Sequence, residues 1–121
     1  MATTDLDKDN FASTIEGNDV VLIDFWAEWC GPCQRFSPIY EEASGRHDDV
    51  VFAKVDTEEN QELSMALEIQ SIPTLMGFRD GSLVFRQSGL LNGKQLDNLI
   101  EQIKALDMVA LRREAAEGYG P

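Results

Sequence analysis

The chain has 121 residues, 43% of them hydrophobic, and its 10 basic and 22 acidic residues give a net charge of −12. This length suits one domain with its own core, and the charge excludes nucleic acid and anionic membrane surfaces as partners, because both are bound through clusters of Lys and Arg. The polar, acidic start lacks the features of a secretion signal and no apolar run is long enough to span a membrane, so we expect a cytoplasmic protein.

The first predicted elements are a short edge strand within residues 2–6 and a helix over residues 8–16. Asp7 is the candidate N-cap of this helix, and the turn-forming residues 17–19 end it. Residues 20–26 then form an almost continuous apolar run. Such a run is typical of a central strand that is covered on both faces.

Both cysteines lie in the next stretch, Trp29-Cys30-Gly31-Pro32-Cys33. Pro32 suits the first turn of a helix, which we expect to run to about Arg46 with a kink at Pro38. Cys30 would precede that helix, where unpaired N–H groups and the helix dipole lower the pKa of a thiol. Cys33 would lie one turn inside and be more shielded. Because the thiolate is the attacking species in disulfide exchange, Cys30 suits attack and Cys33 suits resolution.

Two other interpretations of the cysteine pair are half of a zinc site and two thiols that only pack in the core. A zinc site needs four ligands, and the only histidine is His47, which we expect at the surface near a helix end. A disulfide across two residues closes too small a loop to stabilise the fold much. We therefore interpret the pair as functional.

The rest of the chain predicts three strands and two helices. In order, they are a strand over 50–56, a helix over 58–69, strands over 75–79 and 82–87, and a helix from Gly93. Asp80-Gly81 is a strong two-residue hairpin turn, and Gly89 marks a bulge or a close approach. The order predicts an α/β protein with a mixed sheet of four to five strands, flanked on both faces by four helices.

Asp24 interrupts the apolar strand, and a buried carboxyl group is costly unless it is protonated or paired. Burial would raise its pKa. Beside the thiols, such an acid can take the proton of Cys33 when that thiol attacks a mixed disulfide. Otherwise Asp24 only completes a buried polar network. Lys54 is its nearest candidate partner, or else a lysine whose stem packs on apolar neighbours.

The stretch from Asp24 to Cys33 resembles the active-site motif of the thioredoxin family. Ser71-Ile72-Pro73-Thr74 resembles the family's segment opposite the active site, whose proline is cis. Other matching positions are the helix proline Pro38, the strand lysine Lys54, the hairpin turn Asp80-Gly81 and the late glycine Gly89. The resemblance covers about residues 6–104.

The resemblance implies the thioredoxin fold and a protein-disulfide reductase that works through reversible oxidation of the dithiol. Cys30 would be the nucleophile, Cys33 the resolving thiol, Asp24 the proton acceptor and Lys54 its modulator. The implied substrate surface comprises Trp29, Gly31, Pro32, Ile72, Pro73 and Gly89. The implied partners are substrate proteins with disulfides and a thioredoxin reductase that uses NADPH and flavin. The chain itself would be a monomer without bound cofactor or metal.

Two departures from the family pattern leave partner preference open. Gln34 follows the second cysteine where many members carry Lys or Arg, although Arg35 follows it, and Gln70-Ser71 replaces a frequent Arg-Gly. Two alternative functions are also open. The first is a disulfide oxidase or isomerase, against which Gly31-Pro32 argues, since oxidising relatives usually have a histidine between the cysteines. The second is a redox-independent binding module that uses the apolar rim of Trp29, Ile72, Pro73 and Gly89.

Residues 105–121 extend beyond the thioredoxin domain, which we place at residues 1–104. Helical spacing of Leu106, Val109 and Ala110 predicts a helix in this extension, and we expect Gly118–Pro121 to fray. The extension is either a solvated helix or an element that docks onto a partner or onto a second copy.

Overall fold

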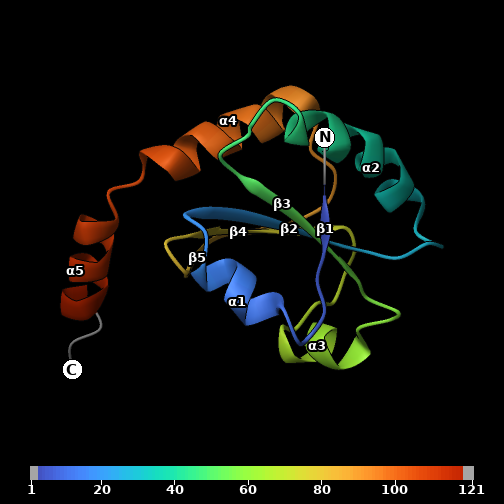
Figure 1. Ribbon diagram of the computed structural model, residues 1–121, viewed down its shortest axis with the longest axis horizontal. Helices are drawn as coiled ribbons and strands as arrows, with labels where there is room; N and C mark the ends of the chain where they lie inside the picture. The colour runs from blue at the N-terminus through green and yellow to red at the C-terminus, as the bar shows by residue number, and fades with distance from the viewer. Residues whose placement is uncertain (1–2, 119–121) are drawn as a thin grey trace.

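The computed structural model describes residues 3–118, which form a mixed sheet with helices on both faces (Figure 1). The elements are β1 (Thr4–Asp5), α1 (Phe11–Glu16), β2 (Val20–Trp26), α2 (Gly31–Ser44), β3 (Val51–Asp56), α3 (Gln61–Ala66), β4 (Thr74–Arg79), β5 (Ser82–Ser88), α4 (Gly93–Ala105) and α5 (Met108–Gly118). The five strands lie in the order β1-β3-β2-β4-β5. β1, β3 and β2 are parallel, whereas β4 and β5 are antiparallel to their neighbours. The predicted mixed sheet is confirmed.

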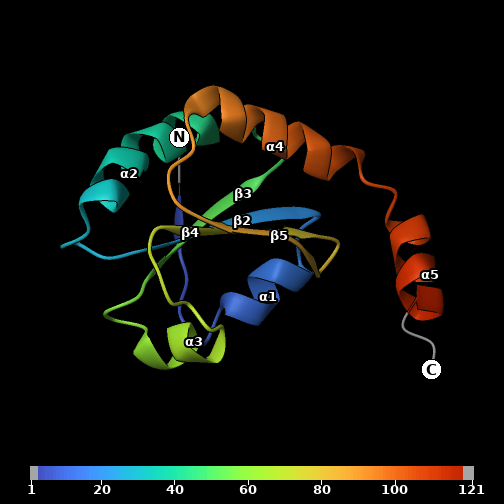
Figure 2. The ribbon, with the colours of Figure 1, turned by 180° about the vertical axis from the view of Figure 1, so that it is seen from behind.

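β2 lies at the centre of the sheet and is buried on both faces, as its apolar run predicts. Val20 and Leu22 pack under α2 and α4, while Val21, Ile23 and Phe25 pack against the side that α1 and α3 cover. Figure 2 shows these two helix layers from behind. Because side chains alternate along a strand, Asp24 lies on the face of α2, the helix that begins at the cysteines.

The first helix begins at Phe11 rather than at residue 8, and Asp7 is not its N-cap. The Asp7 carboxylate accepts the N–H groups of Asp9 at 2.8 Å and Asn10 at 3.2 Å, which fixes a turn before the helix. An aspartate stabilises this turn with the same hydrogen bonds that would cap a helix, so the sequence signals are alike.

The helix predicted over residues 58–69 is reduced to α3. Asp56 at the end of β3 accepts the N–H of Glu58 at 2.9 Å and holds a turn in place of the first helical turn. At the other end, Glu68 takes a left-handed conformation with φ of 56° and stops the helix.

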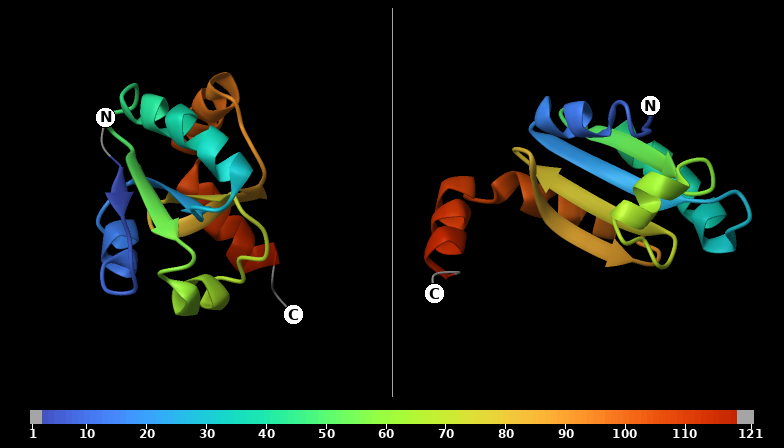
Figure 3. Two further views of the ribbon diagram at one scale, coloured as in Figure 1. Left: turned by 90° about the vertical axis from the view of Figure 1, so that its right-hand side faces the viewer. Right: turned by 90° about the horizontal axis from the view of Figure 1, so that it is seen from below.

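The extension is helical, as predicted: α4 ends at Ala105, and a separate helix α5 begins at Met108. Leu106 is extended between them, with φ −63° and ψ 137°. The Asp107 carboxylate then accepts the N–H of Ala110 at 3.0 Å and starts α5. α5 turns away from α4, at the end of the molecule opposite the start of α2 (Figure 1; Figure 3). The predicted fraying falls mainly on 119–121, outside the described residues.

His47 is not the surface residue expected. Its side chain is 11% exposed and its ring stacks on Phe52, with the ring centroids 6.4 Å apart. Its Nε2 lies 2.7 Å from the Asp97 carboxylate, which also accepts from Arg46. His47 thereby links the end of α2 to α4. Among residues 3–118, no helix is both long enough and apolar enough to span a membrane.

Candidate active site

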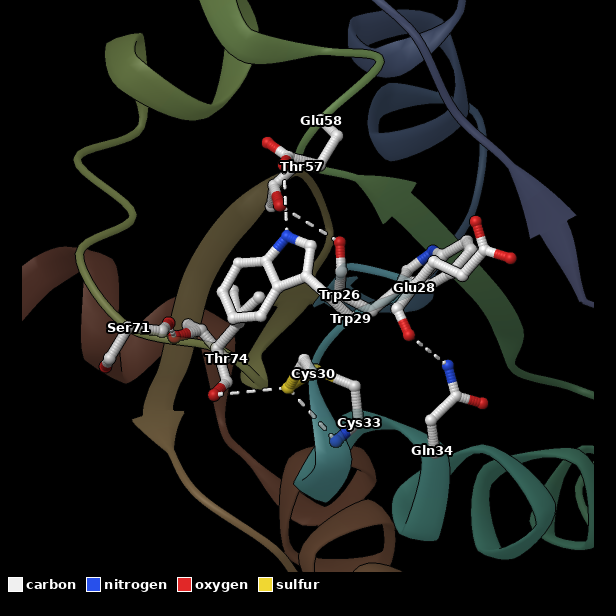
Figure 4. The surroundings of a disulfide bond; sticks show 11 residues. Trp26, Glu28, Trp29, Cys30, Cys33, Gln34, Thr57, Glu58, Ser71 and Thr74 are labelled. Carbon is white, nitrogen blue, oxygen red and sulfur yellow. Dashed lines mark hydrogen bonds between the residues drawn. A yellow bond between two sulfur atoms is a disulfide. The ribbon is translucent and has the colours of Figure 1, made fainter.

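The two cysteines form a disulfide at the N-terminus of α2, directly after the loop that leaves β2 (Figure 4). Cys30 is the N-cap of α2, and Cys33 lies one turn inside, with a Cα–Cα distance of 5.2 Å. The N–H of Cys33 donates to the Cys30 Sγ at 3.2 Å. This is the predicted arrangement. Within residues 3–118, no cluster of His, Cys, Asp and Glu could hold a metal ion.

The segment opposite the disulfide contains a cis peptide bond between Ile72 and Pro73, as the resemblance implies. The Ile72 carbonyl oxygen lies 3.7 Å from the Cys30 Sγ. Gly89 donates its N–H to the Pro73 carbonyl at 2.9 Å and has φ of 105°. No atom lies within 4 Å of a Cβ built on Gly89, and the strand irregularity falls at Gly77/Phe78. Gly89 therefore marks no bulge, but a left-handed backbone.

Asp24 is buried beneath α2, with 1% of its surface exposed. Its Oδ1 has no hydrogen-bond partner among the described residues. Burial raises the pKa of Asp24 to about 7, and the positive charge of Lys54 opposes this rise only in part. Asp24 and Lys54 lie opposite each other on β2 and β3. However, the Lys54 ammonium lies over the Trp26 ring, 4.8 Å from its centroid, and the two residues form no ion pair.

An open pocket of about 470 Å³ connects the buried acid to the disulfide. Asp24, Cys33, Ser37 and Lys54 all line it. Water in this pocket can therefore carry a proton between the Cys33 sulfur and the Asp24 carboxyl group.

The residues of the expected substrate surface differ in their exposure to solvent. Gly31, Pro32 and Gly89 are exposed, Ile72 is half-buried and Pro73 is buried. Pro73 therefore shapes the site through its backbone and not as part of an exposed apolar rim. Trp29 is 70% exposed and projects beside the disulfide.

Two polar contacts around the disulfide could not be predicted from the sequence. Trp29 Nε1 donates to Glu58 at 3.0 Å, and Gln34 Nε2 donates to the Glu28 carbonyl at 2.8 Å. The acidic segment after β3 is visible in the sequence, but nothing local shows that it folds back onto Trp29. The pair is separated by 29 positions.

A disulfide that crosses the start of a helix, after a central strand and opposite a cis-proline segment, defines a thiol–disulfide oxidoreductase of the α/β class. The thioredoxin family model matches residues 2–105. A Streptomyces coelicolor protein named thioredoxin 2 is 50% identical over 116 residues, which cover 96% of this chain and 87% of that protein. Thioredoxin 1 of Plasmodium falciparum is 43% identical over 95 residues, or 78% of this chain and 90% of the relative.

Solved structures agree with the sequence comparisons. A Plasmodium falciparum thioredoxin superimposes with a TM-score of 0.76 at 40% identity, covering 83% of this chain and 98% of the other. A mutant thioredoxin from Halobacterium salinarum gives a TM-score of 0.79 at 36% identity, with 88% and 97% covered. The chain belongs to the thioredoxin family, and it is a protein-disulfide oxidoreductase.

Proposed function

We propose that the protein works in the reducing direction on disulfides of substrate proteins. A thioredoxin reductase would return its dithiol to the reduced state with electrons from NADPH, carried through the flavin of the reductase. The position of Cys30 as N-cap of α2, with Gly31-Pro32 before Cys33, is the observation that carries this proposal. The helix terminus favours the thiolate of Cys30 in the reduced protein, and the two intervening residues lack the histidine common in oxidising relatives.

The proposed reaction has two exchanges. The Cys30 thiolate attacks one sulfur of the substrate disulfide, which breaks that bond, forms a mixed disulfide and releases one substrate thiolate. Cys33 then gives up its proton and attacks the Cys30 Sγ. The second substrate thiolate leaves, and the Cys30–Cys33 disulfide remains. Two electrons pass from the dithiol to the substrate, whose two sulfurs take up protons.

Asp24 is the proposed acceptor of the Cys33 proton. A pKa of about 7 allows this carboxyl group to take up and release a proton near neutral pH. The shared pocket supports this role, because it gives the proton a path between the two residues. Lys54 would modulate Asp24 by favouring its ionised form.

The substrate chain is proposed to lie across Trp29, Gly31, Pro32 and Gly89 and to pair with the backbone beside Pro73. Ile72 supports this pairing, because its N–H forms no hydrogen bond within residues 3–118. A free N–H beside the disulfide is available to an extended partner segment. We further propose that the protein is a monomer and works in the cytoplasm, where thiols are kept reduced.

The coupled assay tests the direction of the reaction. With NADPH and a thioredoxin reductase, the protein should reduce insulin disulfides catalytically, and Cys30→Ser should abolish turnover. Cys33→Ser should instead accumulate the mixed disulfide. Full activity of Cys30→Ser would contradict the mechanism. A redox-independent binding module would keep its partners when both cysteines are replaced by serine. An oxidase would show a more positive reduction potential, where about 30 mV corresponds to 1.4 kcal/mol.

A further inference from the structure

The pocket beside the disulfide carries an excess of negative charge. In addition to Asp24, it is lined by Glu28, Asp56 and Glu59. Its single basic residue, Lys54, lies over the Trp26 ring. Within residues 3–118, none of these carboxylates takes part in an ion pair. The pocket therefore holds more acid than it can neutralise.

The pocket also contains a buried acceptor without a donor. Asp24 lines it with 1% of its surface exposed, and its Oδ1 has no partner among the described residues. The helix residue on the rim, Gln34, is neutral, and its amide is used by the Glu28 backbone (Figure 4). Arg35 does not line the pocket, since its guanidinium lies near Gly31. An amine or guanidinium from outside would supply the missing positive charge.

We propose that this acidic pocket receives a lysine or arginine side chain of the substrate protein, next to the cysteine that Cys30 attacks. This inference rests on the proposed function and adds a preference for basic substrates. The pocket reaches Cys33, so a cation bound there lies beside the disulfide. A concave site of one charge sign attracts the opposite charge and accelerates encounter by about 10-fold or more.

The preference can be tested with three disulfide-bonded peptides. They differ only in the residue beside the cysteine, which is lysine, glutamine or glutamate. The reduced protein is mixed with each peptide, and release of the peptide thiol gives the second-order rate constant. At low ionic strength the lysine peptide should react about 10-fold faster than the glutamate peptide. The ratio should approach one in about 1 M salt, where the Debye length falls to about 3 Å. Equal rates at low salt would overturn the inference.

Failure to reduce even the glutamine peptide would overturn the proposed function instead.

A pair of charge-matched variants separates the pocket from the overall acidity of the chain. The double variant Glu28→Gln/Glu59→Gln should lose most of the preference for lysine. The control, Glu16→Gln/Glu114→Gln, removes the same charge from exposed residues outside the pocket and should keep the preference. The same loss in both variants, or in neither, would show that the acidic pocket does not select the substrate.

Discussion

At the scale of single residues, the least usual feature is the buried Asp24. Its carboxyl group is withdrawn from water, and Oδ1 has no compensating hydrogen bond within the described residues. The free energy of burying it is lowest when it is protonated, which is why burial raises its pKa from 3.8 to about 7. Burial thus gives the Asp24 carboxyl group a pKa suited to proton transfer, but it lowers the stability of the folded protein.

The Asp24→Asn variant should be more stable than the parent protein, and increasingly so as the pH rises. Below the unfolded pKa of 3.8 the carboxyl group is protonated in both states, and folding loses nothing. As the pH rises towards about 7, the unfolded chain ionises while the folded protein does not, so the parent loses stability. The gain of the variant should grow to about 2–4 kcal/mol above that pH. Urea unfolding of the oxidised proteins across this range measures it.

The exposed Asp9→Asn variant controls for the chemical change itself. A stability difference that stays constant with pH would contradict the raised pKa of Asp24. The same variant of Asp24 also reports on mechanism, because loss of the proton acceptor should slow the attack of Cys33 on the mixed disulfide and alter its pH dependence. An unchanged pH profile of that step would leave Asp24 without the proposed role.

At the scale of elements, Arg79 of β4 links the sheet to the end of α4 and to the bend before α5. Its Nη1 donates to the carbonyl oxygens of Ile103, Lys104 and Leu106 at 2.8, 2.9 and 3.1 Å. These are carbonyl groups that a helix end leaves without partners, and a cation there also complements the helix dipole. The contacts hold the bend at which α4 stops and α5 turns away.

Replacing Arg79 by methionine should lower the free energy of unfolding by about 2 kcal/mol, because three half-buried carbonyl groups lose a charged donor. Amide hydrogen exchange should accelerate in the last turn of α4 and in α5. Arg113→Met is the matched control, since Arg113 is exposed and makes no hydrogen bond among the described residues. Equal effects of both substitutions would show that the loss of charge, rather than the contacts, is responsible.

The elements also show what the sequence could predict. The strands, the hairpin and the start of α2 follow from local patterns, and each was predicted to within a residue or two. Helix ends were less predictable. Asp7 and Asp56 stabilise turns that precede helices, whereas Asp107 caps the start of helix α5. In all three cases the carboxylate accepts a nearby backbone N–H, so the local sequence does not distinguish a turn from a helix cap. Only the surrounding tertiary packing decides between them.

The same distinction holds within the candidate site. The disulfide and its helix lie in one short stretch, so their geometry could be predicted from the residues alone. The contact of Trp29 with Glu58 and the acidic pocket depend on where the segment after β3 comes to lie. The sequence also predicts a surface position for His47, because its contacts are with Phe52 and Asp97 on other elements and leave no local signal.

At the scale of the whole molecule, the start of α2, where the disulfide lies, and α5 are at opposite ends (Figure 1). α5 is attached through few contacts: Met108 is 6% exposed and Arg112 donates to the Asp80 carbonyl at 2.8 Å. Most of its remaining surface, including Val109, faces solvent. This separation favours a stabilising extension over one that acts on the substrate site.

Removal of residues 107–121 should therefore leave insulin reduction unchanged while lowering the free energy of unfolding by about 2 kcal/mol, the value of one buried methionine side chain. Met108→Ala alone should reproduce most of this loss, whereas Val109→Ala, at a position 68% exposed, should cost little. Denaturant unfolding and the coupled reductase assay measure the two quantities on the same preparations. A truncated protein that folds normally but reduces insulin more slowly would show that the extension contacts a partner, and one that does not fold would place the domain boundary beyond residue 106.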